Sequence, residues 1–250
     1  MKIFVVNQFA NLPTEPGGNR HYNIAAYLNN HITTELIFSN FLHYARRKRD
    51  FKNLGLPFSF KVLCVPSYSS SYGAALSFLI FSFKLFFYLL RNVNKGDVVY
   101  CGTFHPFQCL VSALVSKINS AHFIYEVRDI PALSLKVVHK KFSIFHRFIR
   151  SIDLYCEKRC EFVVCVSKGF TDYYRVKRSI VIDNDFFISK SQCFVKKVKA
   201  KTITFCYAGS ISDVKNLKFF LSFLSHLVRK GFLFEFHVFG SGPALAGLVE

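Results

Sequence analysis

Acidic residues are scarce in this sequence: 15 aspartates and glutamates stand against 33 lysines and arginines, for a formal net charge of +18. This excess favours a polyanionic partner, namely nucleic acid, an anionic membrane face or phosphorylated substrates. Charge alone does not choose among the three. Because 51% of the residues are hydrophobic and 17% aromatic, the chain has ample material for buried cores, and a disordered chain is excluded.

Zinc-type spacing is also missing. The sequence has no Cys-x-x-Cys and no paired histidines at zinc-ligand spacing, so we expect neither a metal nor a cofactor. Free cysteine is often buried, and we expect the eight cysteines to be reduced core residues. They are Cys64, Cys101, Cys109, Cys156, Cys160, Cys165, Cys193 and Cys206.

No apolar segment makes a membrane span the favoured interpretation. Ala74–Leu90 has 17 residues with Lys84 near its middle, at the lower limit of spanning length. Its apolar residues recur at helical spacing, which predicts a helix packed on a sheet; a helix dipping into a membrane is the alternative. The residues expected on the packed side are Leu76, Leu79, Ile80, Phe83, Phe87 and Leu90.

The amino terminus has no secretory signal. Residues 1–7 carry one lysine and an apolar stretch too short for a signal peptide, and no small-residue cleavage site follows. We therefore expect a cytoplasmic chain.

Short apolar runs alternate with helix-length segments along the chain. This alternation predicts βαβ units, a parallel sheet and an α/β fold, with helices on both faces of the sheet. The expected strands are Lys2–Asn7, Thr34–Phe38, Phe60–Val65, Asp97–Gly102, Phe123–Glu126, Phe162–Val166 and Ser179–Ile182.

A second unit begins after a basic segment without periodicity. We predict a first domain over residues 1–188, a linker over 189–201 and a second βαβ domain over 202–250. A domain of this type normally needs about 100–150 residues, so we expect the second domain to be incomplete.

Two loops after predicted strands of the first domain carry candidate ligand contacts. Gly17 and Gly18 directly precede a predicted helix, where free N–H groups bind anions, although a plain turn is the alternative. His105 follows the fourth strand as a base or hydroxyl ligand, or as a cap of the next helix.

The next strand ends in charged residues. Glu126, Arg128 and Asp129 end an otherwise apolar strand, and buried charges need a partner or a substrate, so a functional role is favoured. Asp129 is the candidate base, and Arg128 is the candidate anion contact.

Glycine turns recur in the second domain. Gly209 and Ser210 follow its first strand, Lys215 opens the next helix, and Gly240 and Gly242 follow the second strand. This geometry suits a diphosphate, although a plain turn is the alternative for Gly240 and Gly242.

Taken in order, these segments resemble the nucleotide-sugar-dependent glycosyltransferases of family 4. Those enzymes are retaining, have the GT-B architecture of two Rossmann-like domains, and make O-antigen and capsule polysaccharides. The segments that carry the resemblance are Pro16–Tyr22, Glu126–Asp129, Cys160–Ser167, Ile182–Asp185, Tyr207–Ser210 with Lys215, and Phe239–Pro243.

The resemblance implies a complete amino-terminal acceptor-side domain, the beginning of a donor-binding domain, and sugar transfer to a lipid-diphosphate-linked saccharide. It implies that Asp129 and Arg128 face the acceptor. Together with the loop positions, we predict catalytic roles for Asp129 and His105 and acceptor contacts by Arg20, Glu126 and Arg128. The residues implied in donor binding are Gly17, Gly18, Gly209, Ser210, Lys215, Gly240 and Gly242. A cation such as Lys215 would stabilise the departing diphosphate, so no metal is expected.

Three departures from the family pattern keep a second hypothesis open. Ser210 stands where the family often has arginine, and residues 183–185 replace its Pro-Asn-Gly. The acidic pair that grips the donor is expected beyond Gly242. The alternative is therefore an inactive, truncated remnant that retains acceptor or membrane binding. A nucleic-acid-binding protein is a further alternative, but no recognition helix, zinc finger or RNP-type sequence supports it.

The basic excess fits an enzyme peripheral to the inner face of the plasma membrane, because anionic headgroups attract cationic surfaces at roughly 1 kcal/mol per residue. The docking candidates are the cations of residues 46–49 and 136–150.

Overall fold

The computed structural model describes residues 1–15, 17–51, 55–129, 143–174, 178–184, 202–209, 211, 215–242, 244–245 and 247. The chain divides into two compact units, Met1–Phe186 and Phe187–Glu250. Each unit has its own sheet, and each is described by itself below.

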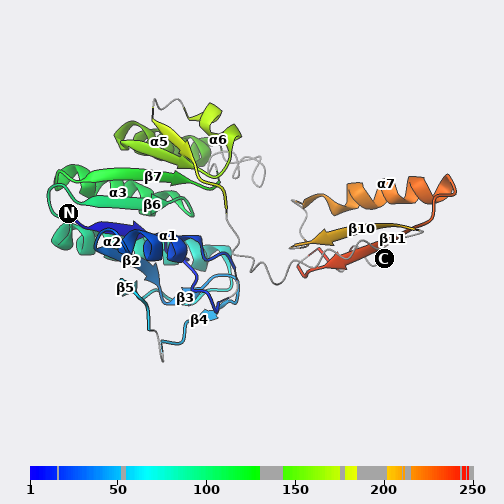
Figure 1. Ribbon diagram of the computed structural model, residues 1–250, viewed down its shortest axis with the longest axis horizontal. Helices are drawn as coiled ribbons and strands as arrows, with labels where there is room; N and C mark the ends of the chain where they lie inside the picture. The colour runs from blue at the N-terminus through cyan, green and yellow to red at the C-terminus, as the bar shows by residue number, and fades with distance from the viewer. Residues whose placement is uncertain are drawn as a thin grey trace. The chain divides into compact units, whose positions relative to one another are not determined.

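The first unit is built on a seven-stranded sheet in the order β5-β2-β1-β6-β7-β8-β9, with every neighbouring pair parallel (Figure 1). The parallel α/β sheet predicted from the sequence is thus confirmed. The strands are β1 (Ile3–Val6), β2 (Thr34–Ser39), β5 (Ser59–Leu63), β6 (Val98–Gly102), β7 (His122–Val127), β8 (Phe162–Cys165) and β9 (Ser179–Val181).

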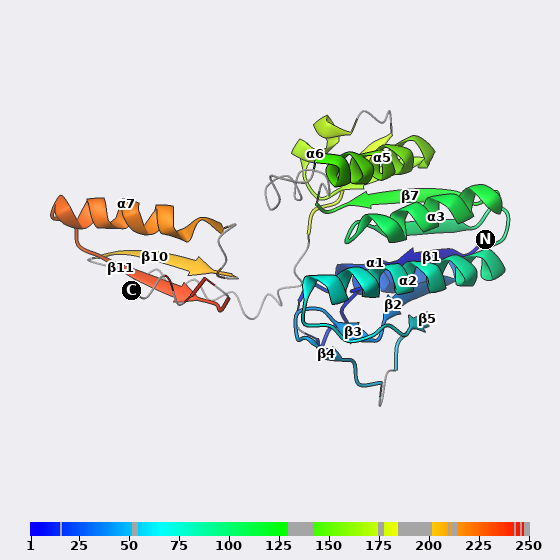
Figure 2. The same cartoon turned by 180° about the vertical axis from the view of Figure 1, so that it is seen from behind.

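Helices cover both faces of this sheet. Helix α1 (Arg20–Asn29) packs on one face, and the layer of α2 (Ser71–Asn92), α3 (Pro106–Ile118) and α5 (Ser143–Arg159) covers the other (Figure 2). Helix α3 lies between α2 and α5 and packs against both. A short helix, α6 (Lys168–Tyr173), follows β8.

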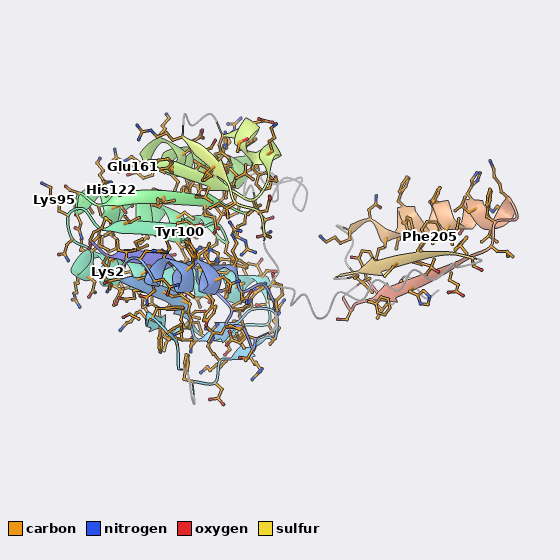
Figure 3. The ribbon with its side chains drawn as sticks, viewed as in Figure 1. Lys2, Lys95, Tyr100, His122, Glu161 and Phe205 are labelled. Atoms are coloured by element: carbon orange, nitrogen blue, oxygen red, sulfur yellow. The ribbon has the colours of Figure 1, made fainter. Side chains whose placement is uncertain are left out.

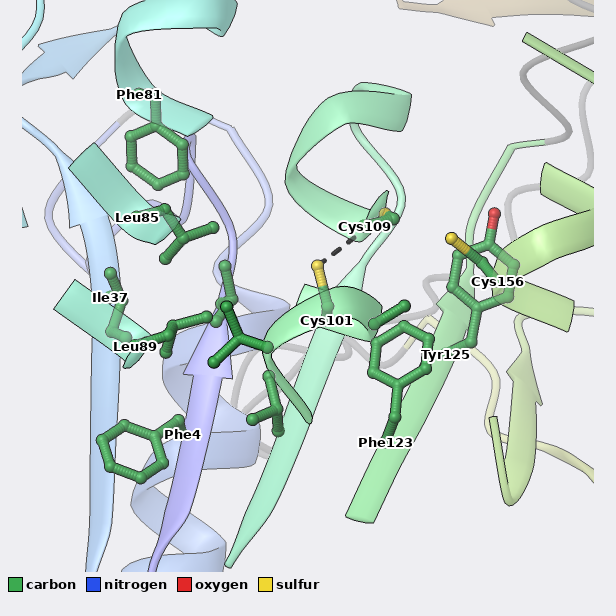
Figure 4. Close-up of a cluster of buried hydrophobic side chains, with 14 of the residues drawn as sticks. Phe4, Ile37, Phe81, Leu85, Leu89, Cys101, Cys109, Phe123, Tyr125 and Cys156 are labelled. Atoms are coloured by element: carbon green, nitrogen blue, oxygen red, sulfur yellow. Dashed lines mark hydrogen bonds between the residues drawn. The ribbon is translucent and has the colours of Figure 1, made fainter. Parts of the chain in front are cut away.

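Two cores result, one on each side of the sheet. The larger one joins Phe4, Ile37 and Phe123 of the strands to Phe81 and Leu85 of α2, as the close-up in Figure 4 shows. The smaller one packs Ala25 of α1 against Val5, Leu36 and Tyr100. Strands covered on both faces explain the continuous apolar runs in the sequence.

The connection from β2 to β5 differs from the predicted βαβ pattern. Its described residues form an antiparallel hairpin of β3 (Phe41–Leu42) and β4 (Arg47–Lys48). Arg49 then turns inward: its Nη2 donates to the Ala10 carbonyl at 2.7 Å and its Nε lies 3.0 Å from Glu15. Desolvation by burial lowers the pKa of Arg49 to about 10. Arg49 is therefore not a surface docking cation, whereas residues 46–48 are exposed.

Helix α2 is longer than predicted, and the face it buries is not the predicted one. Its buried residues are Ser77, Phe81, Ser82, Leu85 and Leu89. The predicted core positions Leu76, Leu79, Phe83 and Phe87 are exposed instead. By length and composition α2 could also cross a membrane, and 28% of its most apolar 18 residues are buried.

The cysteine prediction holds for only part of the set. The seven described cysteines are all free thiols, and Cys101, Cys109, Cys156 and Cys165 are buried. Cys64 and Cys206 are exposed, so the core prediction is wrong for these two. Cys193 lies outside the described residues.

The second unit is one βαβ module with parallel strands β10 (Ile203–Ala208) and β11 (Phe234–Phe239) and helix α7 (Leu217–Arg229). Aromatic rings join the helix to the strands: the Phe220 ring lies edge-on to Phe205 at 5.8 Å and to Phe236 at 5.4 Å between centroids.

Candidate functional site

The carboxyl ends of β1 and β6 form the topological switch point of the first unit. From β1 the chain first adds β2 and β5 on one side and then returns to add β6 on the other, so the strand order reverses at this pair. Open α/β sheets bind ligands in the crevice at such a switch point. The loops after β1, β6 and β7 therefore carry the candidate ligand-binding residues.

A buried charged cluster ties these loops together. The carboxylate of Glu126, at the end of β7, lies 2.6 Å from Nε of Arg20 and 2.6 Å from Nε2 of His21. The Tyr100 hydroxyl, on β6, donates to the same carboxylate at 2.8 Å. Figure 3 labels Tyr100 at the centre of the sheet. Asn7, at the end of β1, completes the cluster with its amide nitrogen 3.1 Å from the His21 ring.

Electrostatics keep the Glu126 carboxylate ionised. Burial by itself raises the pKa of Glu126, but the charges and hydrogen bonds of His21 and Arg20 outweigh it and lower the pKa to about 2. Burial and the neighbouring carboxylate raise the pKa of Tyr100 well above its usual value, so its hydroxyl stays a donor.

Arg20 also fixes the end of the first unit. Its two terminal nitrogens donate to the carbonyl oxygens of Asp183 at 2.6 Å and Ile182 at 2.8 Å. Arg20 and Glu126 were predicted as acceptor contacts, yet both are buried and satisfied by protein groups. Their geometry favours a role in holding the loops, and direct acceptor contact by them stays a prediction.

Asp129 and Arg128 lie where the sequence placed them, at the carboxyl edge after β7. Asp129 is exposed and Arg128 is half-buried. The Thr103 hydroxyl, after β6, accepts from the Arg128 backbone N–H at 2.9 Å and donates to the Asp129 carbonyl at 3.4 Å. The Asp129 carboxylate therefore has access to solvent on a backbone held by the neighbouring loop.

His105 serves as the N-cap of α3. Its Nδ1 accepts from the Gln108 backbone N–H at 3.3 Å, and its ring stacks on Phe78 at 4.6 Å between centroids. It is fully buried, and desolvation lowers its pKa to about 3, so the ring is neutral at physiological pH. Of its two predicted roles, the structure favours the cap.

The first loop leaves the start of α1 open. The N-cap residue Asn19 makes no side-chain capping bond, and no acidic residue stands in the first turn, so free N–H groups remain for an anion. Gly17 has φ +109, and a Cβ there would lie 2.4 Å from the Asn11 side chain. Gly18 differs, because a Cβ there would meet nothing within 4 Å.

The predicted glycines of the second unit bring two chain segments together. The Gly209 N–H donates to the Phe239 carbonyl at 2.9 Å, and Gly209 has φ +155. A Cβ on Gly240 would lie 1.9 Å from the Gly209 carbonyl oxygen, and one on Gly242 would lie 2.0 Å from that of Ile211. Lys215 is exposed beside the start of α7, where the N-cap Asn216 makes no capping bond. Ser210 lies outside the described residues.

We expect Gly240→Ala to destabilise the second unit by about 1–3 kcal/mol, because backbone atoms must move apart to admit the methyl group. The measurement is backbone hydrogen exchange of β10 and β11, which should accelerate while β1 and β6 keep their protection. Gly247→Ala is the control in the same unit, because a Cβ there would meet only the Lys218 ammonium, at 3.7 Å. It should change stability by less than about 0.5 kcal/mol. Equal exchange in the Gly240 variant and wild type would contradict the close approach.

Sequence reasoning missed His21, Tyr100 and Asn7 as members of the cluster. One signal was present: Tyr100 and Gly102 lie two apart on β6 and share a face of the strand. A Cβ on Gly102 would lie 2.2 Å from the His21 ring and 2.7 Å from the Glu126 carboxylate, so this glycine makes room for the ion pair. Among the residues that the structure describes, no three His, Cys, Asp or Glu side chains are placed to share a metal ion.

Sequence comparison finds no matching family model and no matching curated protein. Solved structures do match. The apo form of the lipopolysaccharide outer core galactosyltransferase WaaB aligns with 99% of this chain at a TM-score of 0.56 and 17% identity. Alr3699/HepE of Anabaena, solved in complex with UDP, aligns with 99% of this chain and 71% of its own at a TM-score of 0.53 and 15% identity. The chain spans 63% of the length of WaaB. The fold is therefore α/β and GT-B-like, the fold of glycosyltransferases.

Proposed function

We propose that this chain acts in the transfer of a sugar from a nucleotide-sugar donor to a lipid-linked or saccharide acceptor in cell-surface polysaccharide synthesis. One observation carries the proposal: both units together align over 99% of the chain with a galactosyltransferase of lipopolysaccharide synthesis. The UDP bound to Alr3699/HepE, a second match, supports a nucleotide-sugar donor. The retaining chemistry of family 4 and an O-antigen product belong to the same proposal.

Each unit has an open helix start at which donor phosphates could bind. In the first unit, the N–H groups in the first turn of α1, after Gly18, have no side-chain cap from Asn19. In the second unit, Lys215 adds a positive charge beside the start of α7. A cation and helix N–H groups both stabilise the negative charge that builds up on a departing diphosphate.

The acceptor would bind on the Asp129 side. Asp129 is exposed at the carboxyl edge, with Arg128 next to it. A carboxylate in this position can take the proton of an acceptor hydroxyl, and the guanidinium can contact an acceptor phosphate. A lipid-diphosphate acceptor would bring the chain to the inner face of the plasma membrane, in line with its net charge of +18.

Calorimetric titration of UDP and GDP into the 250-residue chain tests the donor assignment, and we expect a micromolar Kd for one of them. Gly18→Val should weaken that affinity about tenfold, because a side chain blocks the approach of a phosphate to the backbone. Gly55→Val is the matched control, since a Cβ at Gly55 also meets nothing within 4 Å. Equal affinities in both variants would remove the first loop from the donor site, and absence of binding to folded wild type would refute a nucleotide donor.

A further inference from the structure

Helix α2 presents an apolar stripe to solvent. The stripe consists of Tyr72, Leu76, Leu79, Phe83 and Phe87, whose exposed fractions range from 42% to 91%. Successive members lie three or four residues apart, so they line one side of the helix. A continuous exposed apolar surface of this kind marks a site of interaction.

The opposite side of α2 holds the helix flat on the first unit. Phe81, Leu85 and Leu89 have no exposed surface and point into the core shown in Figure 4. The Lys84 ammonium donates to the Cys64 carbonyl at 2.7 Å and so fastens the helix to the segment after β5. With this packing kept, α2 can lie along an apolar phase but cannot cross it.

Positive charge surrounds the stripe. Strand β5 and helices α2 and α3 contain no acidic residue, whereas Lys61, Lys84 and Arg91 are exposed around α2. Beside the stripe lies a groove of about 490 Å³ between α2 and β5. Phe83, Phe87 and Val62 line it together with Lys84 and Arg91. An apolar floor with cations is the chemistry of a lipid with an anionic headgroup.

Helix α5, in the same helical layer (Figure 2), also has exposed apolar residues and cations. Ile144, Phe145 and Phe148 of α5 are exposed, and Phe148 contacts Phe107 of α3 at 6.5 Å between ring centroids. Arg147 on α5 is exposed, and Arg150 is half-buried. A second copy of this chain would bring a like charge of +18 against this surface, which disfavours self-association through it.

We propose that the α2 stripe is the docking surface for an anionic lipid bilayer, with α2 lying in the plane of the interface. The inference shares the membrane location of the proposed function but does not depend on sugar transfer. The sequence had predicted membrane contact by basic runs. The structure favours contact by an apolar helix face flanked by cations. Amphipathic helices bind membranes in this way, through buried apolar area together with attraction to anionic lipids.

Vesicle flotation of the full chain tests the surface, with phosphatidylcholine vesicles alone and with phosphatidylglycerol added. The variant Leu76→Gln, Leu79→Gln, Phe83→Gln should bind the anionic vesicles at least tenfold more weakly than wild type, with an unchanged UDP affinity. The matched control is Phe219→Gln, Phe223→Gln, Val228→Gln, which removes equally exposed apolar residues from α7 and should stay within twofold of wild type. Circular dichroism and thermal melting confirm that each variant is folded.

A tryptophan introduced into the stripe can report its depth in the membrane by fluorescence, because the chain has no tryptophan of its own. We expect the emission of Phe83→Trp to shift to the blue on anionic vesicles and to be quenched by brominated lipids, and that of Phe219→Trp to change little. Binding by the stripe variant equal to wild type, or an unshifted Phe83→Trp in vesicle-bound protein, would overturn the proposal. The proposal would also be overturned if wild type bound no vesicles and formed a dimer that the stripe variant converts to a monomer. Failure here with intact UDP binding leaves the donor assignment standing.

Discussion

Glu126→Gln is expected to lower the free energy of unfolding of the first unit by about 3–5 kcal/mol, because it leaves the buried charge of Arg20 without its carboxylate. Arg20 is 8% exposed and Glu126 is not exposed at all, so water cannot replace the lost partner. Urea denaturation followed by far-ultraviolet circular dichroism measures the change. The substitution should also weaken the Arg20 hydrogen bonds to the carbonyls of Ile182 and Asp183, which follow β9.

The exposed pair of His122 and Glu161, labelled in Figure 3, supplies the control. Both side chains are nearly half exposed, so Glu161→Gln should cost less than about 1 kcal/mol. Similar costs for the two variants would show that the Glu126 cluster is not a buried charged network.

The same cluster predicts how stability depends on pH. The pKa of Glu126 is lowered from 4.5 to about 2 in the folded chain, so folding favours the ionised carboxylate. Its contribution is therefore fully present above the unfolded pKa and is lost as pH falls from about 4.5 through about 2. In that window the unfolding free energy of wild type should fall more steeply than that of Glu126→Gln.

Leu85→Ala should destabilise the first unit by about 2–5 kcal/mol, since truncation of a fully buried leucine leaves a cavity. Leu85 has no exposed surface and packs between α2 and the sheet (Figure 4). Leu79→Ala, on the same helix but 51% exposed, should stay within about 0.5 kcal/mol of wild type. Chemical denaturation of both variants measures the difference. A large cost at Leu79 with a small one at Leu85 would mean that the sequence-based choice of the packed face was right.

Helix α2 also shows where sequence reasoning stops. Its spacing and length predicted a helix, but the segment is apolar on nearly every side, so no periodic pattern marks the packed face. The buried face includes Ser77 and Ser82, and Ser77 accepts a hydrogen bond from the Gln8 side chain at 3.0 Å. Two buried serines and the exposed Phe83 and Phe87 depart from the usual rule, and only the tertiary packing reveals this.

Sequence reasoning likewise located part of the candidate site and missed the rest. The alternation of apolar runs and helix-length segments predicted parallel strands. The sequence therefore placed Asp129 correctly after a strand and Gly18 correctly before a helix. The ion pair of Arg20 with Glu126 joins residues 106 apart in the sequence, and no local pattern reports such pairing. The charges at the end of β7 therefore looked functional, although one of them, Glu126, is paired with Arg20 of α1.

Hydrogen exchange of the 250-residue chain with and without UDP or GDP tests the central claim, that this GT-B-like chain binds a nucleotide-sugar donor and that an open helix start contacts the donor phosphates. The account predicts that the nucleotide slows exchange of the backbone N–H groups at Gly18–His21, at Lys215–Leu217 or at both, with little change in α2. Protection confined to other segments, or no protection at saturating concentrations of either nucleotide, would contradict it.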